Sequence, residues 1–154
     1  MRLNLSIFAA FAAVFNAMAA PHCMNRTDVN GTSPSSTLSD PVKTYDCDGS
    51  VMCSTLKVQW CDEAVNWSLI RTDEAIYGPA GSGQPHLGAC HGRGTDFGCA
   101  IVLEGSKECK RSGNDIWWDY QEIRKSGCHH CGHKRWGNGC STTIDYYPEC
   151  DWVR

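Results

Sequence analysis

The stretch SGNDIWWDYQEIRKSGC, residues 112–128, decides the fold, because it holds the clearest helical pattern of the chain and ends at a cysteine. Ile116 and Ile123 fall on one face of a helix with 3.6 residues per turn. Asn114 precedes the apolar pattern and is expected to cap the helix by accepting a backbone hydrogen bond. Gly127 can adopt the left-handed conformation that commonly ends a helix. We therefore predict a helix that follows its cap residue Asn114 and stops before Gly127.

Weaker patterns on both sides of this segment predict the remaining elements. Alternating apolar and polar residues indicate strands, whereas apolar residues three and four apart indicate a helix. Together they predict an α+β fold, a disulfide-rich two-layer sandwich of two helices on an antiparallel sheet. The predicted elements are a strand through Leu56, Val58 and Trp60, a helix over Asp62 to Tyr77, a buried strand over Phe97 to Leu103, and a final strand through Thr142, Ile144 and Tyr146 after a turn at Asn138 and Gly139.

The start of the chain predicts export. Residues 1–19 combine Arg2, an apolar run and the small-residue pattern around Ala19, which is typical of a cleaved signal peptide. We expect a secreted, extracellular protein with a flexible arm over residues 20–45 and a folded domain over residues 46–154. Sequons predict N-glycosylation at Asn25, Asn30 and Asn66.

Eleven cysteines follow the leader, and in an oxidising compartment they predict a disulfide framework. Five bridges leave one thiol, and Cys23 is our candidate for the unpaired or intermolecular cysteine because it precedes the folded part. We otherwise expect a monomer. The ten cysteines expected to pair are Cys47, Cys53, Cys61, Cys90, Cys99, Cys109, Cys128, Cys131, Cys140 and Cys150.

The net charge is negative, but the charged residues are distributed unevenly along the sequence. Without the leader, 17 acidic side chains stand against 13 basic ones, which disfavours nonspecific nucleic-acid binding. Residues 105–139, however, carry seven basic and four acidic groups. A positive cluster with an adjacent aromatic residue is a candidate target-binding surface, because arginine and tryptophan are enriched at binding hot spots. Its members are Lys107, Lys110, Arg111, Lys134, Arg135 and Trp136. The alternative, which we favour slightly, is a solvated charged loop and hairpin tip with Trp136 packed against the sheet.

Two chemical alternatives are weaker. A zinc site would use closely spaced thiolates and imidazole, but cysteines of an exported chain are expected to be oxidised. A secreted ribonuclease would need a general acid and base near a phosphate, yet no spacing pairs the available groups, and no known catalytic motif is present. We expect no enzymatic activity and no cofactor. The residues weighed were Cys128, Cys131, His133 and Cys140 for zinc, and His86, His91, His129, Glu104 and Glu122 for catalysis.

Several cysteine-centred motifs occur in a fixed order over residues 46–150. In order and spacing they resemble the smut-fungus killer protein four toxin family, a group of small secreted fungal proteins. The motifs are CDGSVMC at residues 47–53, AC at 89–90, GCAIVL at 98–103, SGCHHCG at 126–132 and TIDYY at 143–147.

The resemblance implies an α/β sandwich in which the opening cysteine pair bridges the closing pair. Here it would join Cys47 and Cys53 to Cys128 and Cys131, with the choice of partner left open. It also implies inhibition of competing cells, attributed in the founding toxin to block of calcium channels.

This sequence departs from that toxin, which has a lysine immediately before the cysteine that corresponds to Cys90. Here Gly88 and Ala89 stand before the cysteine, and the acidic net charge weakens attraction to an anionic channel.

From these observations we expect a killer-toxin-like protein or virulence effector that inhibits competitor or host cells. Its partner would be a target-cell surface protein or ion channel, or a cell-wall glycan, and not a nucleic acid. The alternative is a carbohydrate-binding or shielding effector without toxicity.

Overall fold

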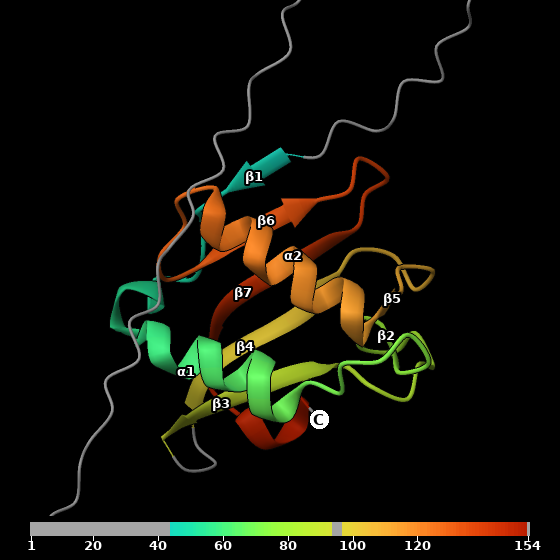
Figure 1. Cartoon of the computed structure of the whole chain (residues 1–154), viewed down its shortest axis with the longest axis horizontal. Helices are drawn as coiled ribbons and strands as arrows, with labels where there is room; N and C mark the ends of the chain where they lie inside the picture. Colours follow the sequence, from blue (N-terminus) through green and yellow to red (C-terminus); the bar gives the residue numbers. More distant parts are fainter. Residues whose placement is uncertain (1–43, 94–96, 154) are drawn as a thin grey trace, which may run out of the picture. The chain divides into compact units, whose positions relative to one another are not determined.

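The computed structural model describes residues 44–93 and 97–153, and a five-stranded antiparallel sheet runs through them (Figure 1). The strand order is β1-β6-β7-β4-β3, so β1 and β3 are the edges. Two further strands of two residues each, β2 and β5, pair with each other outside this sheet. The bounds are β1 Thr44–Asp46, β2 Ile76–Tyr77, β3 Gly88–Arg93, β4 Phe97–Glu104, β5 Arg111–Ser112, β6 Gly132–Arg135 and β7 Ser141–Tyr147.

Side chains on both faces of the interior strand β4 are covered, because alternate side chains of a strand point to opposite sides. On one face Ile101 is fully buried in the main core beneath α1 (Val58–Glu63) and α2 (Gly113–Lys125). Figure 1 shows both helices lying across this face of the sheet. On the other face Ala100 belongs to a small second core with Val153. The predicted α+β sandwich of two helices on an antiparallel sheet is confirmed.

Helix α2 forms where its pattern predicted, but Ser112 caps it instead of Asn114. The Ser112 side chain accepts a hydrogen bond from the backbone N–H of Asp115, while the Asn114 amide donates to Asp73. The helix therefore begins two residues earlier than predicted, at Gly113 instead of Asp115. At the other end, Gly127 follows the helix with φ +105°, as a left-handed terminator should.

The predicted strand through Leu56, Val58 and Trp60 is wrong, because α1 already begins at Val58. Burial there follows helical spacing, with Cys61, Ala64 and Val65 in the core. Three alternating residues fit the start of a helix as well as a strand.

The predicted helix over residues 62–77 is also wrong in extent. A π-helical turn, Ala64–Ser68, continues α1, and the backbone becomes extended at Leu69. Ile76 and Tyr77 form β2, which pairs with β5. The Tyr77 hydroxyl accepts a hydrogen bond from the N–H of Ile70, just beyond the last turn. This hydrogen bond joins residues seven positions apart and fixes the chain just after the helix. No pattern in the sequence indicates it.

Five disulfides join all ten cysteines of the described residues, which is the expected framework. Such a number of bridges indicates an oxidising environment. No helix of the described residues is long and apolar enough to cross a membrane. The expected leader, Cys23, Asn25 and Asn30 lie outside the described residues, and Thr44 and Tyr45, which we assigned to the arm, form part of β1. The bridges are Cys47–Cys128, Cys53–Cys131, Cys61–Cys99, Cys90–Cys150 and Cys109–Cys140.

A buried ion pair fixes α2 to the sheet. Lys134 of β6 is 2% exposed, and its ammonium group contacts the carboxylates of Asp119 and, at 2.6 Å, Glu122 on α2. Thr142 of β7 donates a hydrogen bond of 2.5 Å to Asp119, and Arg111 lies 3.4 Å from the same carboxylate. Burial alone would lower the pKa of Lys134, but the two carboxylates outweigh it and raise this pKa above its usual value. Lys134 is therefore charged although it is buried between α2 and the sheet.

Replacing Lys134 by methionine should destabilise the fold by about 3 kcal/mol, because Asp119 would keep a buried charge with only Arg111 to balance it. Chemical unfolding under nonreducing conditions measures this loss. Lys125→Met, at an exposed position of the same helix, should change stability by less than about 0.5 kcal/mol. Equal stability of the two variants would contradict the assigned role of Lys134.

Candidate binding groove and polar network

The second core lies on the sheet face that the helices leave open. A short 3-10 helix, η3 (Cys150–Val153), is tied to β3 by the disulfide Cys90–Cys150. Its Val153 packs with Ala100, and Val102 of β4 adds to the cluster. This bridge holds the end of the described chain against an edge strand, so that η3 forms one wall of a groove along β4.

The groove has a volume of about 400 Å³ and carries apolar, aromatic and acidic side chains. Trp152 is 73% exposed and Tyr147 36%, so both rings can contact a ligand. Tyr147 is paired in register with Gly98, near the start of β4, whereas Glu104 ends that strand. Six residues of strand separate these two points, roughly 20 Å along the backbone. We call this site the Trp152 groove; its lining residues are Pro79, Ala80, Leu87, Val102, Leu103, Glu104, Gly105, Tyr147, Trp152 and Val153.

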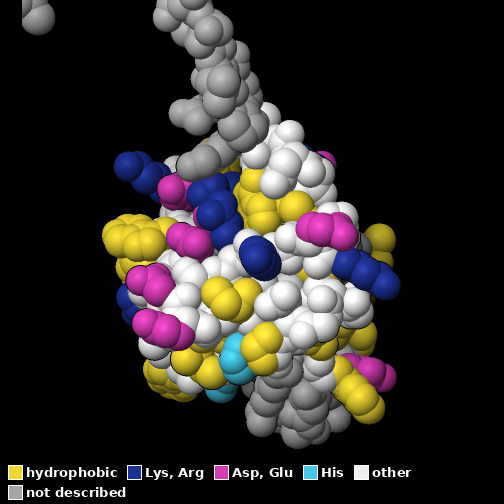
Figure 2. All heavy atoms as spheres, turned by 90° about the vertical axis from the view of Figure 1, so that its right-hand side faces the viewer, with side chains coloured by type: hydrophobic (Ala, Val, Ile, Leu, Met, Phe, Trp, Pro, Cys, Tyr) yellow, Lys and Arg dark blue, Asp and Glu magenta, His cyan; other side chains and the backbone are white. Residues whose placement is uncertain are grey.

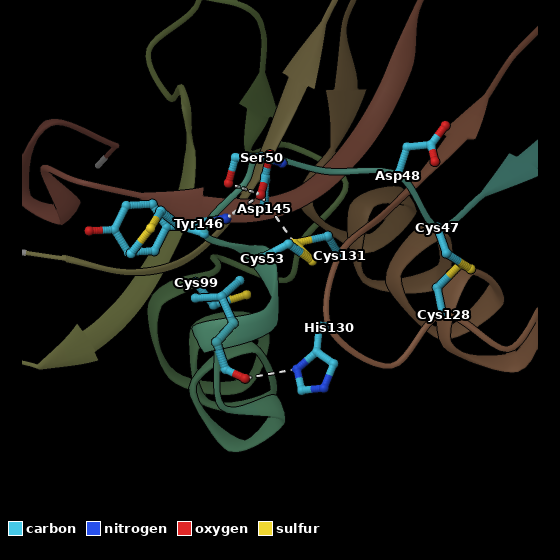
Figure 3. The surroundings of a disulfide bond; sticks show 12 residues. Cys47, Asp48, Ser50, Cys53, Cys99, Cys128, His130, Cys131, Asp145 and Tyr146 are labelled. Atoms are coloured by element: carbon cyan, nitrogen blue, oxygen red, sulfur yellow. Dashed lines mark hydrogen bonds between the residues drawn. A yellow bond between two sulfur atoms is a disulfide. The ribbon is translucent and has the colours of Figure 1, made fainter.

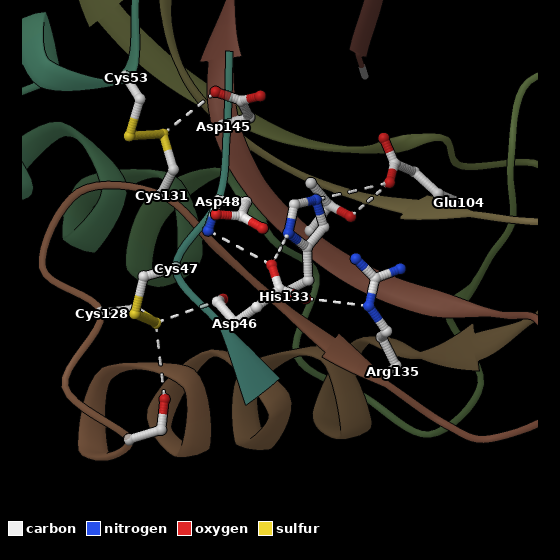
Figure 4. A network of polar contacts seen from close by, with 12 residues as sticks. Asp46, Cys47, Asp48, Cys53, Glu104, Cys128, Cys131, His133, Arg135 and Asp145 are labelled. Carbon is white, nitrogen blue, oxygen red and sulfur yellow. Dashed lines mark hydrogen bonds and ion pairs between the residues drawn. A yellow bond between two sulfur atoms is a disulfide. The ribbon is translucent and has the colours of Figure 1, made fainter. Parts of the chain in front are cut away.

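Glu104 also belongs to a polar network on the open face (Figure 4). Nδ1 of His133 lies 2.7 Å from a carboxylate oxygen of Asp46, and Nε2 of the same ring lies 3.9 Å from Oε2 of Glu104. The Thr143 hydroxyl donates a hydrogen bond of 2.8 Å to that oxygen. Arg135 donates to the second oxygen of Asp46 at 2.9 Å. Three neighbouring strands and one edge strand therefore converge on one acid-base cluster.

Asp46 is the charged anchor of this network. Partial burial alone would raise the pKa of its carboxyl, but the hydrogen bonds and charges of His133 and Arg135 outweigh it and hold this pKa below the usual value. Asp46 is therefore ionised at neutral pH. The ionised Asp46 carboxylate accepts a hydrogen bond from the Nδ1–H group of His133. The other ring nitrogen, Nε2, then points toward Glu104.

Two disulfides next to Asp46, both drawn in Figure 3, restrain the chain around it. Cys47–Cys128 follows β1 immediately, and Cys53–Cys131 closes the loop that comes after it. The backbone N–H and the hydroxyl of Ser50 donate to the Asp145 carboxylate at 2.8 and 2.9 Å. The opening cysteine pair thus joins the closing pair, in the arrangement that the resemblance implied.

The predicted positive cluster does not form one binding surface. Lys134 and Trp136 are buried, at 2% and 8% exposure. The Arg111 guanidinium stacks over the Trp136 ring at 4.3 Å, and Arg135 is paired with Asp46. Figure 2 shows basic, acidic and apolar side chains interspersed on the face it displays. Of the six residues of the predicted cluster, all of which lie in the described part of the chain, only Lys107 and Lys110 are exposed without an ion pair.

The chemical alternatives are not assembled either. Cys128, Cys131 and Cys140 are each in a different disulfide, so none is a thiolate ligand for zinc. Within the described residues, no hydrogen bond or ion pair joins any two of the five catalytic candidates. His91 pairs with Glu63 at 3.1 Å, His86 lies against Tyr77, His129 is exposed on a loop, Glu122 binds Lys134, and Glu104 meets His133.

The third sequon is placed at the surface. Asn66 is exposed in the π-helical turn, where its amide donates a hydrogen bond of 2.8 Å to the carbonyl of Asp62. Glycosylation at Asn66 stays a prediction.

Sequence reasoning missed the groove. Trp152 and Tyr147 lie near the end of the chain without a periodic pattern, and Asp46 stands 87 residues from His133. The one usable signal was an aromatic residue two positions after the last cysteine, Cys150, which restrains it.

Comparison with known proteins corrects the family assignment. The model of the meiotically up-regulated gene family MU117 matches residues 45–150, and because this is more than half of the chain, the chain belongs to that family. The resemblance to the killer protein four toxin family is therefore wrong as an assignment, since the family found is a different one. Among curated proteins, none matches the chain.

Asp46→Asn should lower stability by about 1 kcal/mol at pH 7, because a neutral amide no longer attracts the Arg135 guanidinium and accepts a weaker hydrogen bond from His133. A folded-state pKa below the unfolded one stabilises above the unfolded pKa, and this contribution is lost as pH falls through the folded pKa. The gap between wild type and variant should thus close between about pH 4 and pH 2. Urea titrations across this range measure it, with the exposed Asp48→Asn as control; a gap independent of pH would refute the role of Asp46.

Proposed function

We propose that this member of the meiotically up-regulated gene family is an exported protein that binds a cell-wall carbohydrate in the Trp152 groove and acts without catalysis. The observation that supports this most is the groove itself, where two exposed aromatic rings and one carboxylate lie along a rigid strand. Its volume of about 400 Å³ falls in the range of small-ligand sites.

Carbohydrates suit such a surface because they combine apolar ring faces with hydroxyl groups. An exposed indole offers a flat apolar face, as Trp152 does, and a carboxylate such as Glu104 accepts hydrogen bonds from hydroxyls. Two aromatic rings, Trp152 and Tyr147, line the groove, which favours a chain of sugars over a single ring.

Export is the second part of the proposal. The five disulfides are consistent with an oxidising compartment, and the apolar run with small residues near Ala19 supports secretion through a cleaved leader. A monomer held by these bridges is suited to conditions outside the cell.

Trp152→Ala should weaken binding to wall oligosaccharides at least about tenfold, because truncating a tryptophan anchor commonly costs more than about 1.4 kcal/mol. Calorimetric titration with oligosaccharides from glucan and chitin measures the affinity. Trp118→Ala is the matched control, since Trp118 is 61% exposed on α2 and does not line the groove. Failure of the wild type to bind any of these oligosaccharides would refute the proposal.

Growth inhibition of competitor or host cells is a second candidate function, supported by a projecting apolar tip. Val51 is 96% exposed and Met52 42%. The bridges Cys47–Cys128 and Cys53–Cys131 flank this loop on both sides, so little conformational entropy is lost when it docks. A rigid apolar tip is suited to a hydrophobic pocket of a membrane protein on the target cell.

Val51→Asp should abolish growth inhibition by the purified protein, because a charge at the tip cannot enter an apolar pocket without a large desolvation cost. Dose-response curves on fungal and plant cells measure the effect. Ile70→Asp, a similar change at an exposed apolar side chain elsewhere, should keep the wild-type potency. An inactive wild type, or equal potency of Val51→Asp and wild type, would count against this candidate.

A further inference from the structure

We infer that the ligand of the Trp152 groove is an amino-sugar oligomer with free, protonated amines, and that Glu104 selects it. This rests on the proposed carbohydrate binding and adds the charge of the ligand. The observation behind it is the chemistry of the lining: Glu104 is the one residue charged at neutral pH among the described residues that form the groove.

The Glu104 carboxylate is positioned but still available. Its side chain is 55% exposed, and Oε2 is held by the Thr143 hydroxyl at 2.8 Å. Among the described residues, no hydrogen bond reaches Oε1. One oxygen therefore fixes the orientation of the group, and the other can accept a hydrogen bond from a ligand.

Among the described residues, no basic side chain donates a hydrogen bond to Glu104. The nearest is the His133 ring, whose Nδ1 lies 2.7 Å from Asp46 and whose Nε2 lies 3.9 Å from Oε2 of Glu104, beyond hydrogen-bond distance. Arg135 binds the other oxygen of Asp46. Asp145 on the same sheet face adds a further negative charge, which the N–H and hydroxyl of Ser50 bind without carrying a charge. The open face thus carries the carboxylates of Asp46, Glu104 and Asp145.

The aromatic lining favours the same ligand. The faces of Trp152 and Tyr147 attract an ammonium group through their negative π surfaces, and a carboxylate in a partly apolar groove gains most from a cationic partner. An acetylated amine lacks the charge, and a uronic acid is repelled by Glu104. A linear oligomer carries an amine on every sugar. Whichever of its sugars stacks on the aromatic side chains, another amine can therefore lie near Glu104.

The test compares glucosamine oligomers with N-acetylglucosamine oligomers of the same length, titrated calorimetrically at low salt and a pH at which the amines are protonated. Wild type should bind the free-amine oligomer at least about fivefold more tightly, and added salt should reduce this preference. Glu104→Gln should remove the preference by weakening the free-amine oligomer alone. Glu108→Gln, which removes the same charge from an exposed side chain outside the groove, should keep it.

The outcomes separate this inference from the proposed function. Equal binding of the two oligomers by wild type, or an unchanged preference in Glu104→Gln, overturns the inference and leaves carbohydrate binding in place, provided that Trp152→Ala still loses affinity. No binding of either oligomer by wild type overturns the inference, and absence of binding to glucans as well overturns the proposed function.

Discussion

The fold depends on the disulfides that join the start of the domain to the segment just after α2. Cys47–Cys128 joins residues 81 apart, and in the chain-entropy model a loop of that size destabilises the unfolded state by about 4 kcal/mol. Once it has formed, Cys53–Cys131 closes only a short ring of neighbouring residues, so its further entropic contribution is much smaller. The second bridge acts mainly on the native state, where it holds the loop that carries Ser50 against Asp145.

This constraint explains how an edge strand of three residues can carry a functional group. β1 pairs only with β6, and a strand so short has little pairing energy of its own. Cys47 follows its last residue directly, which keeps Asp46 opposite His133 in the register of the two strands. The charge of Asp46 then sets the orientation of the His133 ring, and the ring in turn faces Glu104 at the end of the groove. A crosslink at one edge of the sheet thus affects the surroundings of Glu104, which lies on β4, three strands away.

Sequence patterns succeeded where one element carries its own signal and failed where position depends on distant residues. Helix α2 and the strand over residues 97–103 have long, consistent patterns and lie where they were predicted. In the segment from Leu56 to Trp60, the predicted alternation rested on three residues only, and the segment enters helix α1. The disulfide Cys61–Cys99 holds this helix on β4. The toxin resemblance failed for a related reason. Cysteines and glycines recur at turns next to disulfides in many small proteins whose layers are joined by such bridges.

The same distinction explains why the positive cluster misled and the groove was missed. A local count of charges in residues 105–139 is correct, but the fold turns Lys134 inward to bind Asp119 and covers Trp136 with Arg111. Lys134 and Arg111 therefore bind Asp119 of α2, whereas on the open face Arg135 is paired with Asp46, and Glu104 and two exposed aromatic rings line the groove. A surface of that composition repels polyanions and favours ligands that are neutral or cationic. The internal use of the basic residues thus determines which ligands the exterior can bind.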